Sequence, residues 1–327
     1  MRDILISENI AGAAVDSLCA RFDVLRLPEL WKDAEGLIRH ASDTRVLFVR
    51  NQTRVTGDVF RAAQGLVAIA RAGAGLDNID VNAAKQAGVI VTYAPDQNSI
   101  SVAEYTIALM LALANRITEA NADAKAGGWN RHQFVGHEVY GKTLGVIGVG
   151  KIGYLTAVRA QTFGMRILAC DPQLSPDNVY LSQLKAELVE LDELLSRADF
   201  VSCHVPATSQ TIGLMNRQRF ARMKPTAFLI NTSRGEVIDE ADLLEALKAG
   251  QIAGAALDVR ASEPPQRGGL ELLPNVILTP HIAAFTCEAQ ERVTRAVCED
   301  IVCILEGKAP KNSALPLNGA SRSSLRG

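Results

Sequence analysis

Short apolar runs recur along the chain and alternate with longer stretches that have helical spacing. In the first hundred residues the apolar runs lie at 3–7, 46–50, 66–71 and 89–93. A second series begins near residue 141, with runs at 143–150, 166–172, 199–206, 227–233, 254–259 and 275–283. The clearest helical patterns lie at 102–126, 151–164 and 288–306. Apolar strands interleaved with helices predict α/β units built on parallel sheets.

The pattern at 102–126 predicts one long helix. Ser99 or Ser101 is placed to cap its start, and Glu104 to close a capping box. The longest apolar stretch within it, YTIALMLALA at 105–114, is too short to span a bilayer. The sequence therefore predicts no membrane association, and no targeting segment is recognisable at its start.

Composition narrows the class of protein. The 327 residues are 48% hydrophobic and 21% charged, which is typical of a globular protein of two domains. The net charge of −2 argues against binding to nucleic acid or to anionic membranes. The six cysteines form no CxxC pair and are expected to be reduced, and no metal site is predicted. A cytoplasmic location is expected.

The sequence GVGKIG at 148–153 stands between an apolar run and a helical pattern. Gly148 permits a tight turn, Gly150 lets the backbone approach a pyrophosphate, and Gly153 allows the helix to pack closely on the strand. Asp171 ends the next apolar run, where a carboxylate accepts hydrogen bonds from ribose hydroxyls and repels a 2′-phosphate. A structural glycine-rich turn is the alternative, but the context favours an NAD site.

Three polar residues, Arg234, Glu263 and His281, lie at or just after the ends of strands in the second series. The carboxyl ends of parallel strands meet at one edge of a sheet, where ligands bind. An arginine can bind a carboxylate through two hydrogen bonds, and a histidine can exchange a proton with a carbonyl or hydroxyl oxygen. A histidine beside apolar neighbours is more often structural, but its context makes His281 a candidate acid/base, with Glu263 supporting its imidazolium form.

Five motifs in order carry a resemblance to a known family: GVGKIG, HVPATSQT at 204–211, NTSRGEVID at 231–239, ALDVRASEP at 256–264 and LTPHIA at 278–283. The chain resembles the D-isomer-specific 2-hydroxyacid dehydrogenases over about 310 residues. The resemblance implies NAD-linked oxidoreduction of a 2-hydroxy acid and 2-oxo acid pair, with Arg234, Glu263 and His281 as the catalytic set.

The resemblance also implies two Rossmann-like domains, with doubly wound parallel sheets, one inserted into the other. We expect an NAD-binding domain at 99–286, a substrate-binding domain formed by 1–98 and 287–318, and a loose tail at 319–327. The loop SEPPQRGGLELLPN at 262–275 departs from the family pattern through its Gly-Gly pair, so its path is not predicted.

Further cofactor residues follow from the resemblance; besides Gly148, Gly150, Gly153 and Asp171 they are Lys151, Ile152, Pro172, His204, Val205, Pro206, Thr211, Thr232, Ser233, Asp258 and Ala283. Among them, Asp258 is expected to bind the nicotinamide carboxamide. His204 is interpreted as part of the cleft wall rather than as a second proton carrier. The backbone N–H groups of Ala74 and Gly75 are expected to bind the substrate carboxylate, unless RAGAGLDNID is simply a glycine-rich turn.

The stretches VRNQTRVT at 49–56 and RAGAGLDNID at 71–80 most resemble the short D-3-phosphoglycerate dehydrogenases. Arg50 is then a candidate to bind a second anionic group on the substrate, with a surface arginine as the alternative. Two other functions stay open: a glyoxylate or hydroxypyruvate reductase, and a non-catalytic scaffold that senses the dinucleotide. Trp129, Phe134 and Tyr140 would be costly apolar surface in a monomer, which favours a homodimer.

Overall fold

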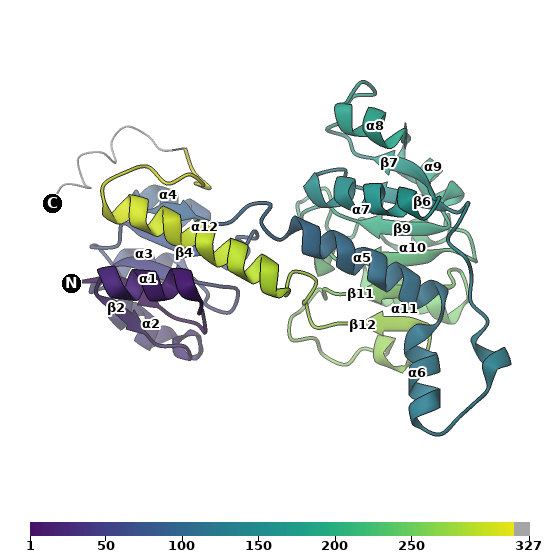
Figure 1. The fold of residues 1–327 in the computed structure, drawn as a ribbon, viewed down its shortest axis with the longest axis horizontal. Helices are drawn as coiled ribbons and strands as arrows, with labels where there is room; N and C mark the ends of the chain where they lie inside the picture. Colours follow the sequence, from purple (N-terminus) through teal and green to yellow (C-terminus); the bar gives the residue numbers. More distant parts are fainter. Residues whose placement is uncertain (317–327) are drawn as a thin grey trace. The chain divides into compact units, whose positions relative to one another are not determined.

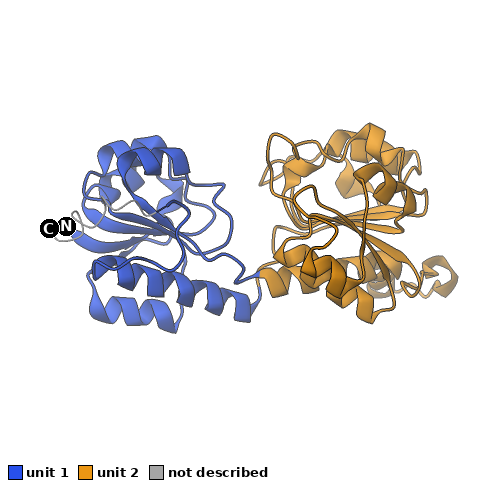
Figure 2. Cartoon of the chain, turned by 90° about the horizontal axis from the view of Figure 1, so that it is seen from above, with its two compact units in different colours: residues 1–98, 286–327 blue, residues 99–285 orange. Residues whose placement is uncertain are grey.

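The computed structural model describes residues 1–316, so the predicted tail at 319–327 lies outside the described residues. The chain forms two compact units, which Figure 2 colours separately. Unit 1 consists of Met1–Asn98 together with the chain from Thr286 onward, and unit 2 is Ser99–Phe285. Unit 2 is thus inserted between two segments of unit 1. Both units are α/β with parallel sheets, which confirms the predicted fold class.

Unit 1 contains a five-stranded sheet in the order β2-β1-β3-β4-β5. Its strands are β1 (Arg2–Ile6), β2 (Val24–Arg26), β3 (Thr44–Val49), β4 (Ala68–Arg71) and β5 (Ile90–Thr92). Its helices are α1 (Ala13–Arg21), α2 (Ala34–Ala41), α3 (Gly57–Ala62), α4 (Val81–Ala87) and α12 (Cys287–Leu305), with a 3₁₀ turn at Leu30–Lys32.

Helices cover both faces of this sheet because alternate strand residues point to opposite sides. In β1, Ile4 and Ile6 pack in one cluster with residues of α1 and α12, whereas Leu5 packs in a second cluster with residues of α2, α3 and α4. The long helix α12 is drawn in yellow in Figure 1 and comes from the end of the chain. Unit 1 therefore builds one of its two core layers from a segment that follows unit 2 in the sequence.

Unit 2 contains a seven-stranded sheet in the order β12-β11-β10-β9-β6-β7-β8. Its strands are β6 (Thr143–Ile147), β7 (Arg166–Cys170), β8 (Glu187–Leu188), β9 (Phe200–Cys203), β10 (Phe228–Asn231), β11 (Gly254–Leu257) and β12 (Val276–Leu278). Its helices are α5 (Ser99–Ala114), α6 (Ile117–Lys125), α7 (Lys151–Thr162), α8 (Val179–Leu184), α9 (Leu191–Arg197), α10 (Arg217–Phe220) and α11 (Glu240–Lys248), and its 3₁₀ turns are Arg131–Phe134, Gly235–Val237 and Leu270–Leu272.

The strand order reverses once in each sheet. In unit 1 the chain turns from β1–β2 to β3 on the other side of β1, and in unit 2 it turns from β6–β8 to β9 on the other side of β6. Both orders are doubly wound, and ligands of such sheets bind in the crevice at the carboxyl ends of the strands where the order reverses. The fold thus predicts ligand binding at the loops after β1 and β3 and at those after β6 and β9.

The prediction of one helix over 102–126 was wrong. The segment forms two helices, α5 and α6, bent by 65° at a break where Arg116 has a left-handed backbone with φ of +52°. The Arg116 guanidinium binds Glu119 and the carbonyl oxygen of Gln133, which ties the bend to the following segment. Within the described residues no single helix is long and apolar enough to cross a membrane, although this bent pair passes that test of length and composition.

The predicted capping box at the start of α5 was also wrong. Ser99 and Ser101 lie inside the first turn of the helix and are buried. The Glu104 carboxylate accepts a hydrogen bond from Arg159 of α7 instead of turning back to the helix start. Glu104 thus forms an ion pair with the neighbouring helix.

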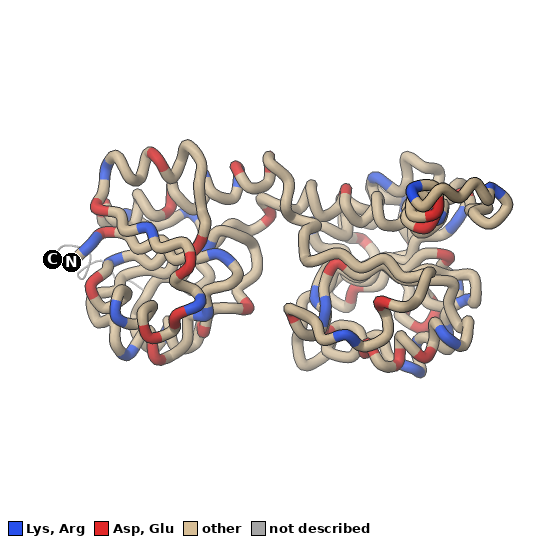
Figure 3. The backbone as a smooth tube through the Cα atoms, turned by 90° about the horizontal axis from the view of Figure 1, so that it is seen from below, with Lys and Arg blue, Asp and Glu red and all other residues tan. Residues whose placement is uncertain are grey.

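Charged residues are distributed over the whole chain. Figure 3 shows basic and acidic residues interspersed in both units.

Candidate active site

The glycine-rich loop between β6 and α7 is tightly packed. Gly148 has φ of +87°, and a Cβ on it would lie 2.7 Å from the Val205 side chain. A Cβ on Gly153 would lie 2.1 Å from the Gly148 carbonyl oxygen, so α7 packs directly against the loop. Beside Gly150, the N-cap of α7, there is open space. The N–H groups of the first helical turn have no partners within the helix, which suits them to bind phosphate oxygens there.

Asp171 lies directly after β7 and faces the glycine-rich loop. Its Oδ2 accepts the N–H of Val149 at 2.9 Å, and its Oδ1 accepts the N–H of Gln173 at 3.0 Å. A carboxylate offers about four acceptor positions, so positions remain for ribose hydroxyls. The residues present therefore fit a dinucleotide, with the pyrophosphate at the start of α7 and the adenosine ribose at Asp171.

The other predicted cofactor residues lie at the carboxyl ends of the strands of unit 2. Lys151 and Ile152 open α7, and the rest follow strands: Pro172 after β7, His204, Val205, Pro206 and Thr211 after β9, Thr232 and Ser233 after β10, Asp258 after β11, and Ala283 after β12. All strands of this sheet run parallel, so these residues lie along one edge of it.

His204 does not have the environment of a proton carrier. Burial lowers its pKa to about 4, which keeps the ring neutral near pH 7. Its Nε2 lies 2.9 Å from the Ser202 hydroxyl oxygen. The neutral ring, partly buried beside the glycine-rich loop, does not support a proton role, and its place in the cofactor cleft stays a prediction.

Glu263 and His281 come together from two different loops. The Glu263 Oε2 and the His281 Nδ1 lie 2.7 Å apart, although 18 positions separate the residues in the chain. Both side chains are partly exposed, so a small molecule can reach the ring. The arrangement is an imidazole whose second nitrogen, Nε2, is available for proton exchange.

Asp258 fixes the loop that carries His281. Its buried carboxylate accepts hydrogen bonds from the Thr279 hydroxyl at 2.6 Å and from the N–H groups of Ile282 and Ala283 at 2.9 and 2.8 Å. Its carbonyl oxygen accepts the N–H of His281 at 2.7 Å. His281 has a left-handed backbone with φ of +56°, which is costly for a residue other than glycine and is held here by these bonds.

Arg234 follows β10 in the turn before a 3₁₀ segment. Its Nη1 donates to the carbonyl oxygen of Ser233 at 2.7 Å, and its charge acts on Glu263. Burial raises the pKa of Glu263, but the hydrogen bond and charge of His281, the N–H of Arg260 and the charge of Arg234 outweigh it, so the pKa lies below its ordinary value. Glu263 is thus an ionised acceptor at neutral pH, and the three predicted catalytic residues form one electrostatic group.

The predicted substrate residue Arg50 lies in unit 1, directly after β3 and next to the strand-order reversal. Its side chain is half-buried and binds Gln290 of α12. Burial lowers the pKa of Arg50 from its ordinary value, while the charge of Glu8 opposes this change. Glu8 is buried and accepts three backbone N–H groups of the same loop, from Arg50, Gln52 and Thr53, at 2.7, 3.1 and 2.9 Å.

Ala74 and Gly75 lie in the loop after β4. The preceding Gly73 has φ of +155°, and a Cβ on it would overlap the Arg71 guanidinium. Among the described residues 1–316 no protein acceptor binds the N–H of Ala74 or Gly75. Two partly exposed N–H groups in sequence suit an anionic ligand.

Two residues that organise these loops, Glu8 and Arg260, were not predicted from the sequence. A signal existed for Glu8, because an acidic residue directly follows the first apolar run. No comparable signal existed for Arg260, since its partners lie 20 and 11 positions away. Within residues 1–316 no group of three or more His, Cys, Asp or Glu side chains is placed to hold a metal ion.

The chain is similar to proteins of a known family. Residues 107–283 match the family model of the D-isomer specific 2-hydroxyacid dehydrogenase, NAD binding domain. These residues lie within unit 2 and contain both the glycine-rich loop and His281. NAD is accordingly the cofactor of unit 2.

Two curated relatives are named D-3-phosphoglycerate dehydrogenase. The protein of Archaeoglobus fulgidus is 43% identical over 312 residues, which cover 95% of this chain and 58% of that protein. The protein of Methanocaldococcus jannaschii is 49% identical over 279 residues, which cover 85% of this chain and 53% of that protein. The chain thus spans little more than half the length of these relatives.

Solved structures share the whole fold. A protein of Thermus thermophilus is 35% identical with a TM-score of 0.89, covering 96% of this chain and 100% of that one. A glyoxylate reductase from Paecilomyes thermophila is 28% identical with a TM-score of 0.85, covering 96% and 98%. By its matching domain and its relatives, this chain belongs to the D-isomer-specific 2-hydroxyacid dehydrogenase family.

Proposed function

We propose that this chain is an NAD-dependent oxidoreductase that interconverts a D-2-hydroxy acid and the corresponding 2-oxo acid. The observation that carries the proposal is the 2.7 Å contact between Glu263 and His281 within the electrostatic reach of Arg234. NAD, when bound, supplies hydride transfer at its nicotinamide ring. Everything else in the reaction is assigned to side chains and backbone groups of the chain itself.

His281 exchanges the proton of the substrate oxygen. Glu263 is ionised and can only accept a hydrogen bond, so the His281 Nδ1 carries a proton and donates a hydrogen bond to Glu263. In this neutral tautomer Nε2 takes a proton from a hydroxyl, and in the imidazolium form Nε2 gives a proton to an oxo group. The Glu263 carboxylate also stabilises the imidazolium form that arises during the exchange. Arg234 orients the substrate carboxylate by paired hydrogen bonds.

We propose further that the substrate bears a second anionic group and that Arg50 binds it. Arg50 lies at the strand-order reversal of unit 1, and curated relatives are named D-3-phosphoglycerate dehydrogenase. The N–H groups of Ala74 and Gly75 bind the carboxylate. The likeness to a glyoxylate reductase favours a small monoanionic oxo acid as the second candidate substrate.

A homodimer remains a prediction. Trp129 and Tyr140 are 80% and 76% exposed, and Val135 between them is exposed as well. Phe134 offers less apolar surface than expected, because it is partly buried and the Arg116 guanidinium lies over its ring. Apolar side chains gathered on one segment of unit 2 support burial against a second copy. The cytoplasmic location also stays a prediction.

The test is NADH oxidation by the purified chain with glyoxylate, pyruvate, 3-phosphohydroxypyruvate and 3-sulfopyruvate. We expect turnover with the dianionic acids, and a fall of about 10²–10⁴-fold in kcat for His281→Ala, the usual contribution of acid–base catalysis. Arg50→Ala should raise KM for the dianionic acids and leave the glyoxylate KM unchanged.

Three outcomes contradict parts of the proposal. Equal effects of Arg50→Ala on both substrate classes remove Arg50 from recognition of the second anion. A preference for glyoxylate selects the second candidate substrate. Binding of NADH without turnover of any acid in the panel favours the dinucleotide-sensing scaffold.

A further inference from the structure

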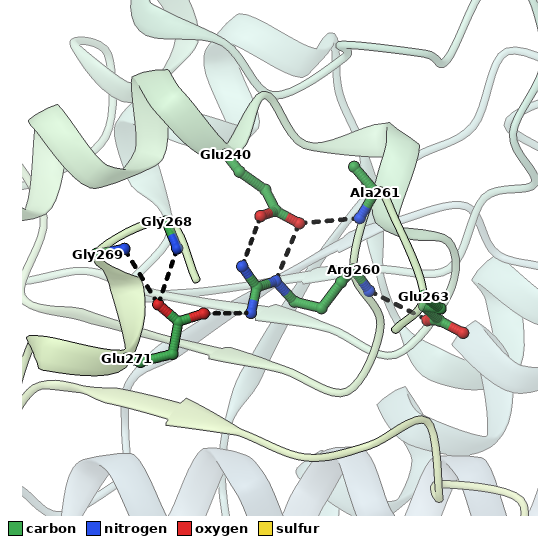
Figure 4. Close-up of polar contacts among 7 residues, drawn as sticks. All are labelled: Glu240, Arg260, Ala261, Glu263, Gly268, Gly269 and Glu271. Carbon is green, nitrogen blue, oxygen red and sulfur yellow. Dashed lines mark hydrogen bonds and ion pairs between the residues drawn. The ribbon is translucent and has the colours of Figure 1, made fainter. Parts of the chain in front are cut away.

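Arg260 is a buried arginine that binds two glutamates. It lies three residues after β11, and its side chain is 7% exposed. Its Nε and Nη2 donate to both carboxylate oxygens of Glu240, at 3.0 and 2.7 Å, and its Nη1 donates to Glu271 at 3.1 Å. Figure 4 shows the guanidinium between the two carboxylates. Such a side chain is held in one position by its fixed fork of donors.

The two glutamates bind both ends of the loop that contains Glu263. The Glu240 Oε1 also accepts the N–H of Ala261 at 2.8 Å, beside the first end of the loop. The Glu271 Oε2 accepts the N–H groups of Gly268 and Gly269 at 3.2 and 3.1 Å, at the other end. The Gly-Gly pair whose path the sequence did not predict is thus the backbone that wraps this carboxylate, and Gly269 has the left-handed φ of +102° that glycine permits.

Glu263 is tied to the same arginine through the backbone. Its Oε1 accepts the N–H of Arg260 at 3.2 Å, while its Oε2 binds His281. One carboxylate therefore connects the buried arginine's main chain to the candidate acid/base. A shift of Arg260 moves the donor that orients Glu263.

Arg260 also lies against the turn that carries Arg234. A Cβ on Gly235 would lie 1.9 Å from the Arg260 carbonyl carbon, so the two backbones are in direct contact. Glu240 begins α11 shortly after this turn. The Arg260–Glu240 pair consequently joins the segment of Arg234 to the segment of Glu263.

The cluster is ionised at neutral pH. Burial raises the pKa of Glu240, but the hydrogen bonds from Arg260 and the Ala261 N–H outweigh it and lower the value. Backbone N–H groups and Arg260 lower the pKa of Glu271 to about 2. Removing the arginine would leave two facing carboxylates without their common partner, which is more disruptive than removing one exposed ion pair.

We propose that Arg260, with Glu240 and Glu271, is a positioning residue that sets the Glu263 carboxylate against the His281 Nδ1 and fixes the Arg234 turn beside it. The inference rests on the proposed function only where it concerns catalysis. The positioning itself is a property of unit 2 and is measurable without turnover.

Arg197 provides the matched control. It also binds two glutamates of unit 2, Glu187 through two nitrogens and Glu193 through one, but its side chain is 40% exposed and it lies at the end of α9. The same change of charge and size at Arg197 therefore leaves the 260–271 loop untouched.

The experiment is a carbon-13 NMR titration of the Glu263 side-chain carboxyl in the full chain, assigned with Glu263→Gln. We expect Arg260→Met to move the midpoint upward toward the ordinary glutamate value, because Glu263 loses its bond to His281. Arg260→Lys should recover part of the native midpoint, and Arg197→Met all of it. An unmoved midpoint in folded Arg260→Met overturns the proposal. If Arg260→Met does not fold, Arg260→Lys and Glu271→Gln decide in the same way.

Kinetics give the second readout. With the preferred oxo acid, Arg260→Lys should lower kcat by about 10- to 100-fold, part of the acid–base contribution, with the Kd for NADH from fluorescence titration within twofold of native. A native kcat with a displaced Glu263 midpoint overturns the catalytic part of the proposal. Absence of turnover in the native chain contradicts the proposed function, whereas the NMR titration still decides whether Arg260 positions Glu263.

Discussion

Glu8 in unit 1 and Asp258 in unit 2 perform the same structural task in different surroundings. Each is a buried carboxylate just after a strand, 3% and 1% exposed respectively, and each binds the loop after the neighbouring strand of its sheet. Glu8 follows β1 and binds the loop after β3, which carries Arg50. Asp258 follows β11 and binds the loop after β12, which carries His281.

The two loops differ in how much else holds them. In unit 1 the Asn78 side-chain amide donates to the carbonyl oxygens of Arg50 and Thr53, at 3.0 and 2.7 Å, and the Thr53 hydroxyl lies 2.8 Å from that of Ser7. In unit 2 the loop after β12 contains a strained backbone at His281, and four of its hydrogen bonds go to the carboxylate and carbonyl oxygens of Asp258. A loop with several independent bonds tolerates the loss of one, so the two carboxylates should differ in their importance for activity.

The largest effect is expected for Asp258→Asn. The new amide NH₂ faces a backbone N–H of Ile282 or Ala283, which leaves a buried donor unsatisfied and costs about 1–3 kcal/mol of stability. Released from its bonds, the left-handed His281 backbone should relax and separate from Glu263. We expect kcat to fall by about 10²–10³-fold, within the range of acid–base catalysis, as measured beside urea unfolding. Asp16→Asn on the exposed face of α1 is the control. An unchanged kcat in a destabilised variant would falsify the special dependence on Asp258.

Glu8→Gln should have an intermediate effect. The stability cost is again about 1–3 kcal/mol, because one of three backbone N–H groups meets an amide NH₂ in place of an acceptor. The Asn78 bonds keep the loop in place, so kcat should change little, and the effect should appear as a higher KM for dianionic acids. A fall in kcat as large as that of Asp258→Asn would show that the two carboxylates do not differ as we infer.

The smallest effects are expected from hydroxyls in the same two loops. Thr279→Val removes one of the bonds to Asp258 and should cost about 1 kcal/mol, with less than a tenfold fall in kcat. Thr53→Val removes the contact with Ser7 and should cost a similar amount with no change in kcat. Thermal unfolding measures the stability cost of each variant, and steady-state rates measure the difference in kcat between them. That difference in kcat disappears if both loops depend equally on their hydroxyls.

Most of the fold was predictable because buried parallel strands are continuous apolar runs. The short edge strands β2 and β8 were not predicted. They have only three and two residues respectively, partly exposed, which is too few to form a recognisable apolar run. The break at Arg116 could not be predicted either, because a left-handed arginine depends on its bonds to Glu119 and to Gln133, which is remote in sequence.

The site, like the fold, was predictable where local sequence determines it and not where tertiary contacts do. Arg234, Glu263 and His281 stand at strand ends, where sequence position implies location, and the structure places Glu263 on His281. The residues that orient these groups could not be predicted from the sequence. The Arg260 guanidinium, for example, is held by glutamates on other segments of the chain. Motifs locate reacting groups, whereas the bonds that orient them depend on the tertiary structure.

The order in which the ribosome makes the chain has a consequence for unit 1. Its sheet is complete when Thr92 has been made, but α12, which buries Val297 and Ile301 on one face of that sheet, begins only at Cys287. At 5–20 residues per second, the intervening unit 2 takes about 10 to 40 s to synthesise. During that time the nascent chain carries an open apolar sheet face, which is the kind of surface that chaperones bind.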